Sequence, residues 1–88
     1  MAPRASQVAR QTPRFHAEGK ALGLRVRQLR LARKWTLEVA AEAANMDLKH
    51  LQKVEAGRLN VTLVTLVRLA EGFDIPLAAL FRKPRRPK

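Results

Sequence analysis

The sequence contains no cysteine among its 88 residues. Disulfide bonds, thiolate zinc sites and a cysteine nucleophile are therefore excluded. A chain of this length has room for one domain with a modest core, so helix packing or self-association must stabilise it. Long apolar runs are also missing: none approaches the roughly 20 residues of a transmembrane helix, and none near the start is typical of a secretion signal. We expect a soluble, cytoplasmic protein with no membrane partner.

Acidic and aromatic side chains are scarce. Only 7 Asp and Glu residues accompany 18 Lys and Arg, and the formal net charge is +11. Such a charge favours a polyanionic partner, with nucleic acid ahead of an acidic membrane surface or an acidic protein. Aromatic residues make up 5% of the chain, which leaves no companion surface aromatics for stacking on single-stranded nucleic acid. We therefore expect Trp35 to fill the core between the first two helices.

The residues needed for catalysis or for holding a cofactor do not occur in a suitable pattern. The sequence shows no Ser or Cys nucleophile with a matching His, no carboxylate pair suited to a cleft and no glycine-rich phosphate loop. Its two histidines are His16 and His50, and because His16 lies near the N-terminus we do not expect them to share a metal ion. We expect a protein that is not an enzyme and that binds no metal and no cofactor.

Basic residues and prolines mark the two ends of the chain. Residues 82–88 carry five basic side chains and no acidic one. The prolines near the ends are Pro3, Pro13, Pro84 and Pro87. Few apolar residues accompany them, so we expect a flexible basic N-terminal arm over residues 1–19, one folded domain over 20–81 and a basic tail over 82–88. The tail is either a solubilising segment or an arm that adds phosphate contacts.

The middle of the chain shows the apolar spacing of helices and no convincing strand pattern. A short fifth helix is expected to start at Pro76, a residue suited to the first helical position. The four helices expected before it cover residues 20–34, 37–44, 48–55 and 63–73.

Several residues in this region are suited to helix ends. Asn45 and Gly57 tolerate left-handed turns where the second and third helices are expected to stop. The residues suited to cap the N-termini of the second, third and fourth helices are Thr36, Asp47 and Thr62.

Three segments of this helical region carry a family resemblance. They are LGLRVRQLR in the first expected helix, TLEVAAEAANMDLKHLQKVEAG across the next two, and TLVTLVRLAEGFDIPLAALF in the last two. Over about residues 21–81 the chain resembles the phage-repressor-like (Xre/Cro-type) helix-turn-helix regulators, including the small Ala41 where the second and third helices cross closely. The resemblance implies a compact all-α, five-helix, lambda-repressor-like domain that binds double-stranded DNA.

The resemblance also implies a recognition helix at about residues 48–55 in the DNA major groove. The side chains expected to contact bases are Leu48, Lys49, Gln52 and Lys53. Those expected to contact phosphates are Thr36, Arg58 and Asn60, together with His50, which is given at most a phosphate or base-edge contact. Lys49 and Lys53 lie four residues apart on one helix face, so an ordinary solvated surface is the alternative interpretation.

The resemblance singles out an ion pair, and apolar side chains expected on the outer side of the last two helices are considered for self-association. Arg30 and Glu55 match a pair that typically joins the first and third helices by a salt bridge, which fixes orientation more than it adds stability. The residues considered for self-association are Val64, Val67, Leu77 and Phe81. Single apolar residues are common on protein surfaces, so an ordinary exposed face is the alternative for the two valines.

Three functions are compatible with these residues. The first is a regulator that binds a partly palindromic operator as a homodimer, like small phage repressors or restriction-modification controller proteins. The second is an antitoxin that binds its own promoter and also neutralises a toxin protein, which copurification of a small partner would favour. The third is an adaptor that binds nucleic acid through its basic arms with little preference between operator-like and scrambled duplexes.

Overall fold

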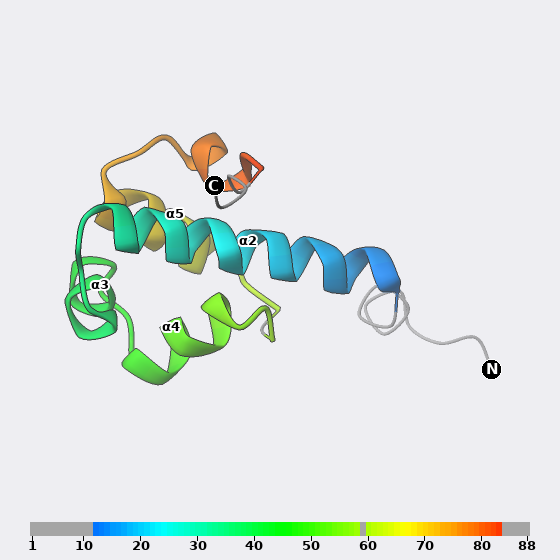
Figure 1. Ribbon diagram of the computed structural model, residues 1–88, viewed down its shortest axis with the longest axis horizontal. Helices are drawn as coiled ribbons and strands as arrows, with labels where there is room; N and C mark the ends of the chain where they lie inside the picture. The colour runs from blue at the N-terminus through cyan, green and yellow to red at the C-terminus, as the bar shows by residue number, and fades with distance from the viewer. Residues whose placement is uncertain (1–11, 59, 84–88) are drawn as a thin grey trace.

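The computed structural model describes residues 12–58 and 60–83, and within these ranges it contains helices and no strand (Figure 1). The α-helices are α2 (Pro13–Ala32), α3 (Leu37–Ala43), α4 (Leu48–Glu55) and α5 (Leu63–Phe73), and a 3₁₀ helix, η1 (Leu77–Phe81), follows them. The expectation of an all-α fold is confirmed. The described residues form four α-helices rather than five, because the last segment has room for little more than one turn between the extended Pro76 and Arg82, a length at which 3₁₀ geometry is common.

Helix α2 begins at Pro13, seven residues before the start expected from the apolar pattern. Thr12 caps it, with its hydroxyl accepting a hydrogen bond of 3.1 Å from the backbone N–H of Phe15. Pro13 is tolerated because the first helical position needs no N–H donor. Residues 13–19 are thus helical, whereas the sequence pattern assigned them to a flexible arm. Residues 1–11 and 84–88, expected in the two arms, lie outside the described residues.

The other helix ends follow the expected local chemistry. The Thr36 and Thr62 hydroxyls accept hydrogen bonds from the backbone N–H groups of Val39 and Thr65. Asp47 occupies the N-cap position of α4 but makes no side-chain capping bond to the described residues. The left-handed turns expected after α3 and α4 are present at Asn45 (φ 52°) and Gly57 (φ 71°), and Lys34 and Asp74 adopt the same conformation.

The core lies around α2, which packs against α4, α5 and η1 (Figure 1). The largest fully buried side chains are Leu51, Leu69, Leu80 and Val26. Trp35 is partly buried and stacks on Phe73 of α5, with ring centroids 5.8 Å apart. Trp35 therefore belongs to the core as expected, but an important part of its packing comes from α5 rather than from the first two helices alone. No helix among the described residues is long and apolar enough to cross a membrane.

Candidate nucleic-acid interface

Two glycines of α2 set the position of α4. A Cβ atom built at Gly23 would lie 2.6 Å from the carbonyl oxygens of both Val54 and Glu55, a separation that real Cβ atoms do not show. One turn earlier, a Cβ at Gly19 would lie 3.2 Å from the carbonyl oxygen of Gly57. The C-terminal end of α4 can therefore lie directly on the backbone of α2 because both positions lack a side chain.

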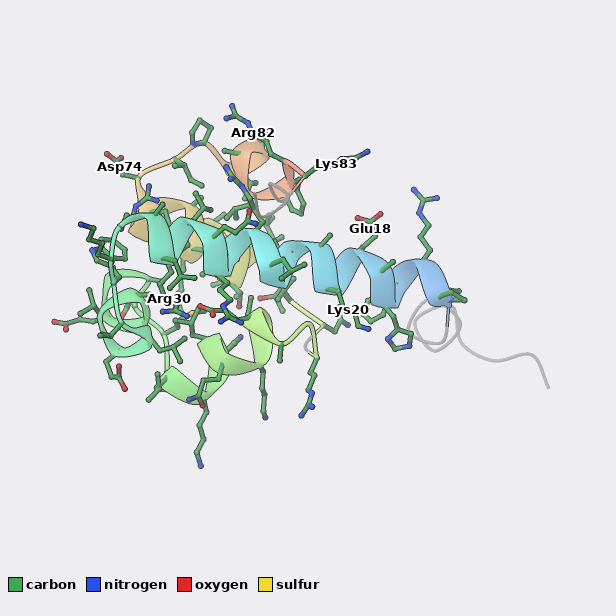
Figure 2. The ribbon with its side chains drawn as sticks, viewed as in Figure 1. Glu18, Lys20, Arg30, Asp74, Arg82 and Lys83 are labelled. Atoms are coloured by element: carbon green, nitrogen blue, oxygen red, sulfur yellow. The ribbon has the colours of Figure 1, made fainter. Side chains whose placement is uncertain are left out.

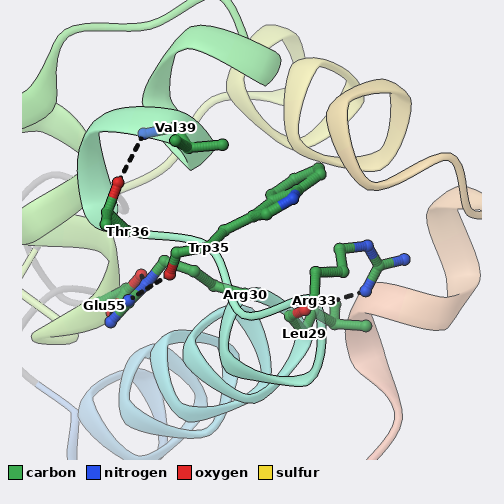
Figure 3. Close-up of polar contacts among 7 residues, drawn as sticks. All are labelled: Leu29, Arg30, Arg33, Trp35, Thr36, Val39 and Glu55. Atoms are coloured by element: carbon green, nitrogen blue, oxygen red, sulfur yellow. Dashed lines mark hydrogen bonds and ion pairs between the residues drawn. The ribbon is translucent and has the colours of Figure 1, made fainter.

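Arg30 and Glu55 hold the same two helices together (Figure 3). The Arg30 Nε–H donates to Glu55 Oε2 at 2.8 Å and an Nη2–H donates to Oε1 at 3.1 Å, so the guanidinium binds the carboxylate through two hydrogen bonds. Their side chains are 11% and 9% exposed. The expected salt bridge is present, and its two-point geometry fixes the rotation of α4 relative to α2.

The same guanidinium also orders the turn before α3. Arg30 Nη1 donates to the carbonyl oxygen of Trp35 at 3.0 Å (Figure 3). The hydrogen bonds to Glu55 are the main cause that raises the pKa of Arg30 above its ordinary value. A raised pKa favours the folded, charged form at every pH below the ordinary arginine value, so this contribution is fully present near neutral pH.

Arg33 provides a second link that the sequence did not reveal. Its guanidinium donates to the carbonyl oxygens of Leu29, at 2.9 Å, and of Phe73, at 2.7 Å. It also lies over the Phe73 ring, 5.1 Å from the centroid. Arg33 thereby ties the end of α2 to the end of α5, and no sequence motif singled it out because both acceptors are backbone oxygens.

The face of α4 that points away from the core carries three of the four residues expected to contact bases. Leu51 and Val54 are buried, whereas Lys49, Gln52 and Lys53 are exposed. These three exposed side chains line one hollow together with Ala56 and Arg58. The structure thus brings the expected base-contacting residues beside the expected phosphate-contacting Arg58. Leu48, the fourth, is half-buried at the first position of α4.

Thr36, expected to contact a phosphate, lies exposed at the N-terminus of α3. Its hydroxyl oxygen accepts from the N–H of Val39 at 3.2 Å (Figure 3), and its own proton can donate to another group. Asn60 is also exposed, in the segment between α4 and α5.

His50 is less accessible than the lysines beside it. Its imidazole is partly buried, and Nε2 is enclosed with no hydrogen-bond partner among the described residues. The third position of α4 lies partly toward the core, next to the buried Leu51. A phosphate or base-edge contact of His50 stays a prediction.

The four residues considered for self-association do not form one patch. Val64 and Val67, 59% and 37% exposed, line a hollow between the end of α3 and α5. Phe81, 59% exposed, instead lines a groove formed with Phe15 and Leu22 of α2. Leu77 is partly buried and packs against the core.

The beginning of the C-terminal tail lies away from α4. Arg82 and Lys83 lie on the opposite side of α2 from α4 (Figure 2). Both side chains are exposed. Neither side chain therefore lies in the surface around α4, and both alternatives for the tail stay predictions.

Comparison with known proteins agrees with this arrangement. Residues 21–81 match the family described as helix-turn-helix domain. The crystal structure of the restriction-modification controller protein C.AhdI from Aeromonas hydrophila is similar, with 35% identity, a TM-score of 0.72 and coverage of 74% of this chain and 98% of that one. Comparison with curated proteins gives no match.

Two further solved structures share the fold at lower identity. An HTH_3 family transcriptional regulator from Vibrio cholerae is 22% identical, with a TM-score of 0.72 over 76% of this chain and 38% of that one. The transcription factor NHTF from Neisseria, described as hypothetical, is 20% identical, with a TM-score of 0.73 over 96% of this chain and 90% of that one.

The fold and the matched residues define the class of this protein as a helix-turn-helix protein. The chain belongs to the helix-turn-helix domain family, and its resemblance to the Xre-like, phage-repressor type is confirmed.

Proposed function

We propose that this protein is a sequence-specific transcription regulator that binds double-stranded DNA by inserting α4 into the major groove. Lys49, Gln52 and Lys53 read base edges in this proposal, with Leu48 in contact with a thymine methyl group. Thr36, Arg58 and Asn60 bind the phosphates beside the groove. These polar residues, unlike the half-buried Leu48, are exposed in the structure.

The observation that carries the proposal is the hollow that Lys49, Gln52, Lys53 and Arg58 line together. A helix face that only meets solvent does not require the helix to have a fixed position. Helix α4 is nevertheless held against α2, by the close contacts at Gly19 and Gly23 and by the Arg30–Glu55 ion pair. Base readout requires donors at fixed positions, because a hydrogen bond to a base edge is lost over a small displacement. The fixed position of α4 relative to α2 therefore supports sequence-specific contacts with bases over non-specific attraction to polyanions.

We also propose that the protein binds as a homodimer on a partly palindromic operator. One helix of eight residues contacts too few base pairs for useful specificity, and paired half-sites about one helical turn apart supply the rest. The exposed Val64 and Val67 offer an apolar surface for such pairing. The 35% identity to a restriction-modification controller protein supports a regulator of this kind.

Selection of bound duplexes from a random pool at near-physiological salt tests the proposal. The expected result is an enriched motif with two symmetric halves whose centres are about 10 base pairs apart. Enrichment of no motif would show that the protein binds DNA without reading it. A single unrepeated motif would retain base reading and refute the dimer.

A further inference from the structure

The start of α2 carries a positive charge on the same side of the molecule as α4. Lys20 is exposed, and its side chain is directed toward the side of α2 on which α4 lies (Figure 2). Glu18, two residues earlier, points to the opposite side of the helix (Figure 2). The flexible arm expected over residues 1–19 would have left the direction of the Glu18 side chain undefined.

The backbone of Lys20 is fixed against the end of α4. A Cβ built at Gly57 would lie 3.0 Å from both the N and the Cα atoms of Lys20, so the two backbones are in direct contact. Gly57 immediately precedes Arg58 and follows α4 by two residues. Lys20 is therefore attached next to the turn that carries the proposed phosphate contacts at Arg58 and Asn60.

Helical structure on both sides of Lys20 makes this position rigid. Helix α2 runs without interruption from Pro13 to Ala32, and Thr12 caps its first turn. The family match begins at residue 21, so Lys20 and the preceding turns of α2 extend beyond the matched domain. Because this part of α2 is capped and packed on Gly57, the backbone atom from which the four-carbon side chain of Lys20 extends has a defined position.

Within residues 12–58 and 60–83, Lys20 forms no ion pair with an acidic side chain. Glu18 is directed away, and the carboxylate of Glu55, at the end of α4, is held by Arg30. The hollow around the end of α4 has three basic residues in its lining, Lys49, Lys53 and Arg58. Lys20 on α2 and Arg58 after α4 thus place positive charge on both sides of the backbone contact at Gly57.

We infer that Lys20 is an additional phosphate-binding residue, which contacts the DNA strand beside the groove that α4 enters. The inference rests on the proposed function, because α4 in the major groove brings that strand to the turn at Gly57. Lys20 extends from α2, outside the helix that is proposed to enter the groove, and its backbone contacts the turn at Gly57. Its ammonium, a compact point charge, is therefore placed for a phosphate oxygen rather than for a base edge. Lys20 therefore strengthens binding to every duplex and leaves the preferred sequence unchanged.

The test measures DNA affinity of the full chain at several salt concentrations for Lys20→Gln. Each phosphate contact releases counterions, so the slope of log affinity against log salt should fall in magnitude by about 0.9 when one contact is lost. Lys20→Arg keeps the charge and should restore the slope. The matched control is Arg14→Gln, which removes one charge from the same exposed part of α2, at a position turned about 120° around the helix axis.

The outcomes separate this inference from the proposed function. A reduced slope for Lys20→Gln, with Arg14→Gln like the unchanged protein, supports the inference. An unchanged slope for Lys20→Gln, or an equal reduction in both variants, overturns it, even if the protein selects a symmetric operator. Binding without a preferred sequence would refute the proposed function, but the salt dependence of Lys20→Gln would still decide this inference. Binding to no duplex would overturn both.

Discussion

Arg30 and Glu55 lie 25 residues apart in the sequence and are joined by two hydrogen bonds of 2.8 and 3.1 Å. Arg30 donates a third hydrogen bond to the carbonyl oxygen of Trp35. One guanidinium thus connects α2, the end of α4 and the turn before α3. Because α4 carries the proposed base-contacting residues, this pair links the stability of the domain to the orientation of its DNA-binding face.

Loss of the Glu55 charge should destabilise the protein. Glu55→Gln leaves the guanidinium of Arg30 largely buried without a counter-charge, and the expected loss in free energy of unfolding is about 3 kcal/mol. Urea unfolding followed by circular dichroism measures it. The control is Glu42→Gln, at an exposed position of α3, which should change stability by less than about 0.5 kcal/mol.

A double-mutant cycle at the same pair adds a sharper criterion. Arg30→Met combined with Glu55→Met should cost less than the sum of the two single replacements, because neither charge is then left buried alone. Additive effects of the single replacements would show that Arg30 and Glu55 do not stabilise each other.

Replacement of Gly23 by alanine should destabilise the protein even though alanine is the better helix former. The added methyl would meet the carbonyl oxygens of Val54 and Glu55, and overpacking of this kind costs about 1 to 3 kcal/mol. The helix propensity of alanine recovers about 1 kcal/mol at most. Thermal unfolding measures the net change, with Ala17→Gly at an exposed position of α2 as the measure of propensity alone. A gain in stability for Gly23→Ala would contradict the close contact between α2 and α4.

Lys53→Ala should weaken binding to the selected operator more than binding to a random duplex. A lost base contact costs about 1 to 3 kcal/mol on the operator, whereas a lost phosphate contact weakens both duplexes alike. Titration of both duplexes at the same salt concentration distinguishes the two cases. An equal fall in affinity would make Lys53 a phosphate contact. Arg14→Gln, at an exposed position of α2 that does not line the hollow around α4, serves as the control for loss of charge.

Val64→Glu should prevent pairing on DNA while leaving the fold intact. Val64 is 59% exposed, so a charge there disturbs little within one chain but is unfavourable in an apolar interface between two chains. The mass of the DNA complex by sedimentation should fall from two chains to one. Leu31→Glu replaces a leucine of similar exposure, 51%, on α2 and should leave the mass unchanged. One chain per operator in the unaltered protein would rule out the dimer.

The features that were predictable from the residues alone depend on local interactions. The N-cap roles of Thr36 and Thr62 and the left-handed turns at Asn45 and Gly57 depend on groups within a few residues, so their patterns are visible in one stretch of sequence. The start of α2 was open to the same reasoning, because Thr12 and Pro13 are a capping residue and a first-position proline. The prediction instead took Pro13 as part of a flexible arm, so the predicted start of the first helix lay seven residues too late.

The Arg30–Glu55 pair was predicted through the family resemblance, since 25 residues separate its members and no local pattern connects them. Three other features come from the packing of the helices against one another. It separated Val64 and Val67 from Phe81, enclosed Nε2 of His50, and brought Lys20 against Gly57. Each depends on which helix faces pack together, and the apolar spacing of a single helix shows its buried side without showing which other helix covers it.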